Sequence, residues 1–128
     1  MIRWHETDLT EFFGVAATYH DGPHSFEFVV SRDGLRLLLT LFDLEGAVYV
    51  SIWRDGLPDA LFTVVRESCT HAQLATDTRQ RHCLEIGSPV QPTTDMGIPP
   101  LLVRGVRVYV EPHFQVEFID VEPRGCVA

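Results

Sequence analysis

Two tight turns constrain the fold of this chain more than any other feature. Residues 25–53 read SFEFVVS, RDG, LRLLLTLF, DLEG and AVYVSIW in succession. Short runs of β-branched, aromatic and leucine residues between such turns are typical of β-hairpins. The Asp-Gly pair at 33–34 suits a two-residue type I′ loop, in which both central residues have positive φ. With a four-residue loop at 43–46, the pairing of three successive strands follows by counting outward.

The two turns, chosen independently, place apolar side chains on the same face of the sheet. Because side chains alternate between the faces of a strand, a register slip of one residue would turn the whole row outward. The predicted row is Phe26, Phe28 and Val30, then Leu41, Leu39 and Leu37, then Val48, Val50 and Ile52. The next turn, at 54–59, leaves two registers open, because either Leu61 or the pair Phe62 and Val64 can face inward.

The opposite face carries polar and aromatic side chains and is the predicted partner-binding surface. Cross-strand Cβ atoms lie about 4.5–5.5 Å apart, so Arg36 can rest on the Trp53 ring as a cation–π pair. Arg, Tyr and Trp are enriched at the positions that dominate binding in protein interfaces. We predict a surface of Arg36, Tyr49 and Trp53, extended by Arg104, Arg107 and Tyr109 if the C-terminal hairpin joins the same sheet. The alternative is that these side chains cover a second sheet or pair internally.

A further hairpin is predicted near the C-terminus, where LLVRGVRVYV and FQVEFID flank residues 111–113. A three-residue loop gives the apolar pairs Val110–Phe114, Val108–Val116 and Val106–Phe118. The other face then pairs Arg107 with Glu117 and Arg104 with Asp120, two opposite-charge pairs facing water. Gly105 within this strand predicts a bulge or a close backbone approach.

The remaining segments have weaker patterns. Residues 1–10 are interpreted as a lead-in, in which Asp8 and Glu11 have the spacing of a capping box for one helical turn. Residues 12–19 alternate like a first strand, the polar stretch 69–82 favours an edge strand over a turn of helix, and 82–86 predict another strand. Residues 88–100 contain four prolines and predict a loop, which is either a binding loop or lid, or a plain crossover. Residues 121–128 are interpreted as a loose tail.

Together these segments predict an all-β fold. The expected architecture is an antiparallel sandwich or small barrel of seven to eight strands, built from consecutive hairpins. A chain of 128 residues suits one domain and can bury a sizeable core. We therefore predict a single domain across residues 1–128.

Charge and hydropathy narrow the range of partners. The formal net charge is −8 at pH 7 and the isoelectric point is near 5.1. This argues against general nucleic-acid or anionic-membrane binding, since both depend on a positive field. A basic protein partner is compatible with this charge, as is a homo-oligomer formed through a sheet edge.

No run reaches the roughly 18 apolar residues of a membrane span, and the N-terminus lacks an apolar signal-peptide core, so we expect a soluble cytoplasmic protein.

The cysteine and histidine residues predict neither a metal site nor another cofactor. The C-x-H and H-C pairs at 69–71 and 82–83 resemble zinc-ligand chemistry. Adjacent residues of a strand point to opposite faces, however, so four ligands would converge only if a turn lay there. The three cysteines are an odd number without CxxC spacing, which indicates reduced thiols. His20 and His24 flank a Gly-Pro turn and are interpreted as solvated.

No sequence motif supports an enzyme. GxSxG, HExxH and a phosphate-binding glycine loop are absent from the sequence. We therefore predict a small acidic, non-enzymatic binding or protein-interaction module, and an inhibitor or immunity-type protein that neutralises a basic toxin is one concrete form. The alternative is a small-ligand-binding barrel or an enzyme. Its cavity would lie between Phe28, Leu39, Val50 and Val108 and would be gated by the 88–100 loop.

Overall fold

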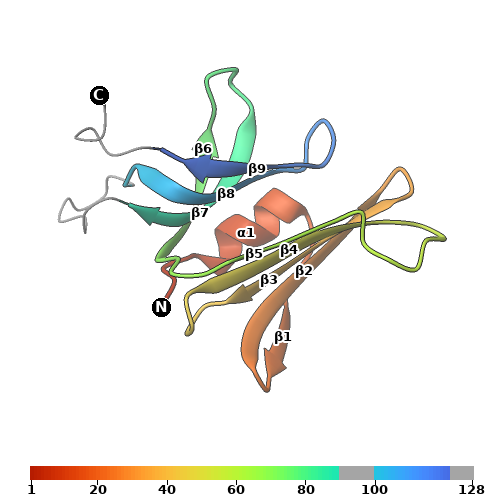
Figure 1. The fold of residues 1–128 in the computed structure, drawn as a ribbon, viewed down its shortest axis with the longest axis horizontal. Helices are drawn as coiled ribbons and strands as arrows, with labels where there is room; N and C mark the ends of the chain where they lie inside the picture. Colours follow the sequence, from red (N-terminus) through yellow and green to blue (C-terminus); the bar gives the residue numbers. More distant parts are fainter. Residues whose placement is uncertain (90–99, 122–128) are drawn as a thin grey trace.

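The computed structural model describes residues 1–89 and 100–121 and shows two antiparallel sheets (Figure 1). The first sheet contains, in this order, β1 (Thr18–Asp21), β2 (His24–Arg32), β3 (Leu35–Phe42), β4 (Ala47–Arg54) and β5 (Phe62–Arg66). The second contains β6 (His71–Thr76), β7 (His82–Pro89), β8 (Leu102–Tyr109) and β9 (Gln115–Asp120). Among the described residues there is one helix, α1 (Glu6–Phe13). Within each sheet the strand order follows the chain order, so each strand pairs with its chain neighbours in the same sheet.

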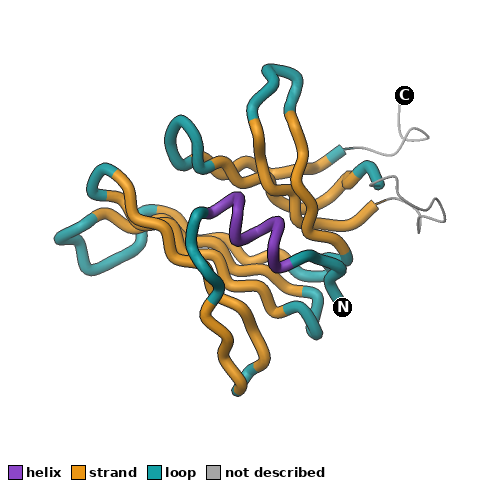
Figure 2. The backbone as a smooth tube through the Cα atoms, turned by 180° about the vertical axis from the view of Figure 1, so that it is seen from behind, coloured by secondary structure: helices purple, strands orange, loops and turns teal. Residues whose placement is uncertain are grey.

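The predicted all-β sandwich built from hairpins is confirmed. The strands form two separate sheets of five and four strands, which distinguishes the sandwich from the barrel. The described part of the chain contains nine strands, where seven to eight were predicted. Figure 2 shows α1 lying between the two sheets.

The central hairpins have the predicted registers. Phe28 lies opposite Leu39, which in turn lies opposite Val50. The loop at 33–34 has positive φ at both residues, 53° and 78°, as a type I′ turn requires. At the turn that left two registers open, Val64 lies opposite Val50 and therefore faces inward.

The C-terminal hairpin also has the predicted register, with Val108 opposite Val116. The predicted close approach at Gly105 is present, because Gly105 lies directly opposite Gly87 in the β7–β8 pair. A Cβ atom added to Gly105 would lie 2.0 Å from the carbonyl oxygen of Ile86. The two backbones are thus closer than any side chain permits.

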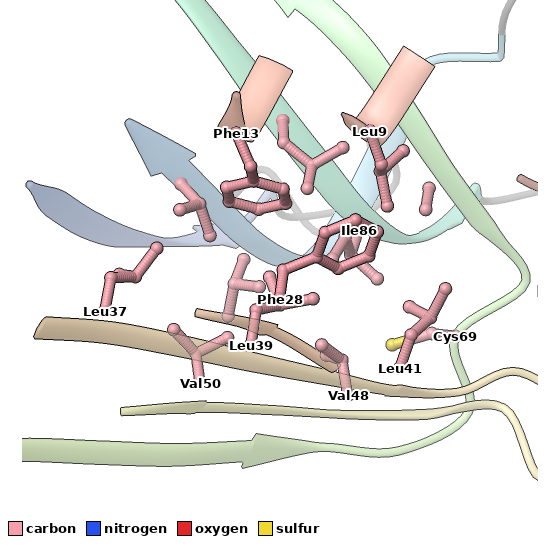
Figure 3. Packing of buried hydrophobic residues seen from close by; sticks show 14 of the residues in the cluster. Leu9, Phe13, Phe28, Leu37, Leu39, Leu41, Val48, Val50, Cys69 and Ile86 are labelled. Carbon is pink, nitrogen blue, oxygen red and sulfur yellow. The ribbon is translucent and has the colours of Figure 1, made fainter. Parts of the chain in front are cut away.

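An apolar core fills the space between α1 and the two sheets. Leu9 and Phe13, four residues apart on the helix, point toward the inner face of the first sheet (Figure 3). The rings of Phe13 and Phe28 stack with their centroids 4.9 Å apart. Ile86 of β7 packs into the same cluster from the second sheet. Full burial of one such side chain contributes roughly 1.5–3 kcal/mol, so this cluster holds both sheets against the helix.

The predictions for the N-terminal residues are only partly confirmed, because a helix forms where one helical turn was predicted but with other bounds, and the strand predicted at 12–19 forms only at Thr18 and Tyr19. The helix begins at Glu6 without a side-chain cap, so the capping box predicted at Asp8 does not form. The expected first strand at 12–19 overlaps the helix, and Phe13 completes the buried face of that helix. Gly14 then ends the helix with a φ of 73°. The alternation that predicted a strand therefore crosses a helix end.

The segment before α1 joins the two sheets. The amide of Ile2 donates to the carbonyl of Asp43, in the β3–β4 turn, at 2.7 Å. Arg3 forms an isolated parallel bridge with His71, and the amide of Ala72 donates to the Arg3 carbonyl at 2.9 Å. The expected lead-in is thus a structural tie between a turn of the first sheet and the edge of the second.

The predicted loop at 88–100 and the predicted tail at 121–128 lie mostly outside the described residues. Ser88 and Pro89 extend β7 beyond its predicted end at Ile86. In the part of the chain that the structure describes, no helix is long and apolar enough to cross a membrane.

Replacing Gly105 with alanine should strongly destabilise the second sheet. The added Cβ would meet the Ile86 carbonyl, and the φ of +152° disfavours any other residue. We expect the free energy of unfolding to fall by about 3 kcal/mol or more in urea denaturation. Gly56→Ala is the matched control, because Gly56 also has positive φ but an added Cβ there would meet nothing within 4 Å. Its expected cost is about 1 kcal/mol, and equal losses would show that the close approach is not what requires glycine.

Candidate functional site

The predicted cation–π pair forms on the outer face of the first sheet. The guanidinium carbon of Arg36 lies 5.5 Å from the centroid of the Trp53 ring. The indole N–H of Trp53 donates to Ser51 Oγ at 2.8 Å, and this hydrogen bond fixes the orientation of the Trp53 ring. Trp53 and Tyr49, which lie on the same face of β4, are half-buried. The two rings are therefore positioned by the sheet while part of their surface stays accessible.

The rest of this face is open. α1 and the second sheet lie on the inner side (Figures 1 and 3), and no described helix or strand crosses the outer side. Val65 lies directly opposite Tyr49 and is 55% exposed, and Val29 is also exposed. We name this surface, made of Arg36, Tyr49, Trp53, Val29 and Val65, the arginine–aromatic face.

The other three predicted residues lie in the second sheet. Arg104, Arg107 and Tyr109 belong to β8, so the predicted continuous surface of six residues does not form. Arg104 is exposed opposite Asp120, whereas Tyr109 is only 1% exposed. The chain changes sheets between β5 and β6, and the hairpin patterns on either side do not reveal this change.

Arg107 and Tyr109 belong to a polar network on the outer side of the second sheet. Arg107 donates to Glu85 and to Glu117, each at 2.9 Å. The Tyr109 hydroxyl donates to Asp77 at 2.9 Å, and burial raises the pKa of this phenol. Because neighbouring strands and turns satisfy these groups, they stabilise the sheet.

Asp77 organises the β6–β7 turn. Its carboxylate accepts hydrogen bonds from the backbone amides of Arg79 and Arg81 at 2.8 and 2.9 Å, and from Arg81 Nε at 2.9 Å. The amide of Arg81 is the main cause that lowers the pKa of Asp77 to about 2, and the Tyr109 hydroxyl adds to it. The Arg81 guanidinium also lies over the Tyr109 ring, 4.4 Å from its centroid. The turn is thus fixed by one carboxylate.

The cysteine and histidine set does not converge. His71 begins β6, whereas His82 pairs with Thr76 at the other end of that strand. Cys69 and Cys83 are buried free thiols, and burial raises the pKa of both. Within residues 1–89 and 100–121, no three His, Cys, Asp or Glu side chains are arranged to hold a metal ion.

His24 is not the solvated turn residue that its position predicted. Its Nδ1 lies 2.8 Å from Asp43 Oδ1, and the Trp4 indole donates to the other oxygen of Asp43 at 3.4 Å. The His24 ring also lies 5.1 Å from that of Tyr19 and 5.5 Å from that of Phe26, between centroids. These contacts form an aromatic cluster around one carboxylate at the end of the first sheet.

The internal cavity of the alternative function is filled by side chains. Phe28, Leu39, Val50 and Val108 have no exposed surface and belong to one packed cluster. Figure 3 shows the first three of these side chains in that cluster. The prediction of a ligand site between these residues is therefore wrong.

A groove of about 610 Å³ opens elsewhere, at the end of the second sheet that carries the β6–β7 and β8–β9 turns. Pro89, the last described residue of β7, lies at the opposite end of that strand. Sequence reasoning missed the groove because three segments far apart in the chain form it. The one sequence feature that could have indicated the groove is Leu74, an isolated leucine in the polar stretch 69–82. The residues that line the groove include Glu11, Phe12, Leu74, His82, Val110 and Glu111.

Replacing Asp77 with asparagine would keep a side-chain acceptor for the turn amides and remove the negative charge. The pKa of Asp77 is about 2, below its ordinary value of 3.8, so its charge contributes stability above about pH 4. That contribution is lost as the pH falls toward 2. We expect Asp77→Asn to be less stable than the wild type at neutral pH, with the difference closing between about pH 4 and 2 in urea denaturation. A difference that stays constant over this range would contradict a charge effect.

Comparisons with known proteins establish the fold. No family model matches the sequence, and no curated protein matches it. Among solved structures, the chain is similar to one in a contact-dependent growth inhibition toxin–immunity protein complex from Klebsiella pneumoniae 342. The TM-score is 0.69, the match covers 91% of this chain and 94% of that chain, and 11% of the residues are identical. At this identity the two chains share a fold.

Proposed function

We propose that this protein is a non-enzymatic interaction module of the immunity type, which binds a basic toxin or enzyme and neutralises it. The observation that carries the proposal is the arginine–aromatic face. It presents Trp53, Tyr49 and Arg36 on the outer side of a sheet whose inner side packs against the core.

The chemistry of this face suits a protein partner. Trp, Tyr and Arg are the residue types that contribute most to binding when an interface excludes water around them. Trp53 is held by Ser51 and Arg36 before any partner arrives, so little side-chain freedom would be lost on binding. The exposed Val29 and Val65 add apolar area beside it.

The net charge supports an inhibitory role toward a basic partner. A chain with a charge of −8 attracts a basic protein over a distance and speeds their encounter at low salt. The complex with the shared fold contains a toxin and an immunity protein. Of these two roles, the acidic charge favours the one that blocks a basic partner.

The proposal places the protein in the cytoplasm. An inhibitor of a toxin that acts inside the cell must be present there before the toxin arrives. The two buried free thiols are compatible with this reducing compartment.

The first test uses the products of the genes next to this one, each purified separately. We expect one basic product to be toxic when expressed alone, and to lose that toxicity when it is expressed together with this protein. The pair should co-elute in size-exclusion chromatography at low salt and bind more weakly as salt is raised. If no flanking product is toxic and none binds at low salt, the immunity role is wrong.

A substitution tests the face itself. In the complex, Trp53→Ala should raise the Kd at least about thirtyfold, equivalent to about 2 kcal/mol, in isothermal titration calorimetry. Leu101→Ala is the control, because Leu101 is 79% exposed and lies beside the second sheet. It should change the Kd less than about threefold. If Trp53→Ala folds by circular dichroism and binds like the wild type, the partner does not use this face.

A further inference from the structure

We propose that the groove between α1 and the β6–β7 and β8–β9 turns is an anchor site for an apolar side chain of the partner, next to a lysine or arginine of the same segment. This inference rests on the proposed function. It adds a second contact, separate from the arginine–aromatic face, and states the chemistry that it takes.

Leu74 is the accessible floor of the groove. It lies opposite Leu84, so its side chain is on the core side of the second sheet. Leu84 is fully buried, yet Leu74 is 41% exposed. α1 contacts β6 but has only 8 residues and ends at Phe13, which gives it a length of about 12 Å. The short helix therefore leaves part of the core side of β6 uncovered.

Both walls of the groove are fixed by hydrogen bonds in the free protein. Arg32, at the end of β2, donates to the carbonyl of Val110 at 2.6 Å and forms an ion pair with Glu111. This contact pins the β8–β9 turn to the first sheet. The other wall is the β6–β7 turn, which Asp77 holds by accepting hydrogen bonds from two backbone amides. A groove with rigid walls loses little entropy when a partner enters it.

The charges around the groove select a basic segment. Glu11 lies at its rim, and the same helix contains no basic residue and also carries Glu6 and Asp8, which are exposed but do not line the groove. None of these three forms an ion pair among the described residues. Two other charged residues at the rim, Arg81 and Glu111, are already paired within the protein. The charge left for a partner is therefore negative.

The size of the groove suits a side-chain anchor. Its volume of about 610 Å³ lies within the range of roughly 300–1,000 Å³ that is usual for ligand pockets. Phe12 and Val110 supply apolar walls beside the Leu74 floor. A phenylalanine or leucine of the partner can pack on this floor. The aliphatic part of a neighbouring lysine then lies over the rim, and its ammonium group reaches Glu11.

Two synthetic peptides test this chemistry without the partner. One carries a phenylalanine and a leucine between lysines, and its twin has glutamates in place of the lysines. We expect the lysine peptide to shift the backbone NMR signals of Glu11, Leu74, His82 and Val110 in the full-length protein at low salt. The glutamate peptide should bind at least tenfold more weakly. Equal binding of the two peptides, or shifts spread over the whole acidic surface, would overturn the proposal.

Two variants locate the contact. Leu74→Ser and Glu11→Gln should each weaken the lysine peptide at least fivefold, and Glu11→Gln should also reduce the salt dependence of binding. Leu44→Ser is the matched control, because Leu44 is an exposed leucine in the β3–β4 turn and does not line the groove. It should bind the lysine peptide as the wild type does. If the groove signals shift with protein concentration alone, a second copy of this chain occupies the groove and the proposal is wrong.

The two proposals fail in different ways. If the partner binds through the arginine–aromatic face and Leu74→Ser leaves that complex unchanged, the groove is not a contact and the immunity role stands. If no basic partner is found, the peptide titration still decides whether the groove takes an apolar side chain beside a positive charge.

Discussion

One constraint governs this structure: the apolar row on β2, β3 and β4 must be covered on one side. Phe28, Leu39 and Val50 form the middle of that row and have no exposed surface. Each contributes roughly 1.5–3 kcal/mol when it is buried. A slip of one residue at either turn would turn the row toward water, so burial of this row holds the register of the whole sheet. α1 and the second sheet are the elements that cover it.

Burial on one side decides which face of the first sheet is available to a partner. The elements that cover the inner face leave the outer face open across the described residues, and Trp53 and Arg36 lie there. In the second sheet, the same residue types are engaged in hydrogen bonds within the protein. Arg107 and Tyr109 also point away from the core, but Glu85, Glu117 and Asp77 satisfy them. An arginine or a tyrosine on the outer side of a sheet is thus accessible to a partner in the first sheet, whereas it stabilises the structure in the second.

The ties between the two sheets also create the groove. Arg32 joins the end of β2 to the β8–β9 turn, and the N-terminal segment joins Asp43 to the edge of β6. These contacts hold the sheets against a helix that is shorter than the surface it covers. The uncovered part, around Leu74, is therefore a rigid apolar recess with acidic residues at its rim. A binding site can arise in this way without any motif in the sequence.

The sequence by itself determined the local pairing. The turns at 33–34 and 43–46 and the hairpin around 111–113 fixed their registers because turn geometry and alternation act over a few residues. The Arg36–Trp53 contact could be predicted for the same reason. The extent of the helix could not, because Leu9 and Phe13 make a buried face only once a sheet lies beside them. The division into two sheets, the burial of Tyr109 and the groove likewise depend on contacts between segments far apart in the chain. No local pattern encodes those contacts, so only the tertiary structure decided them.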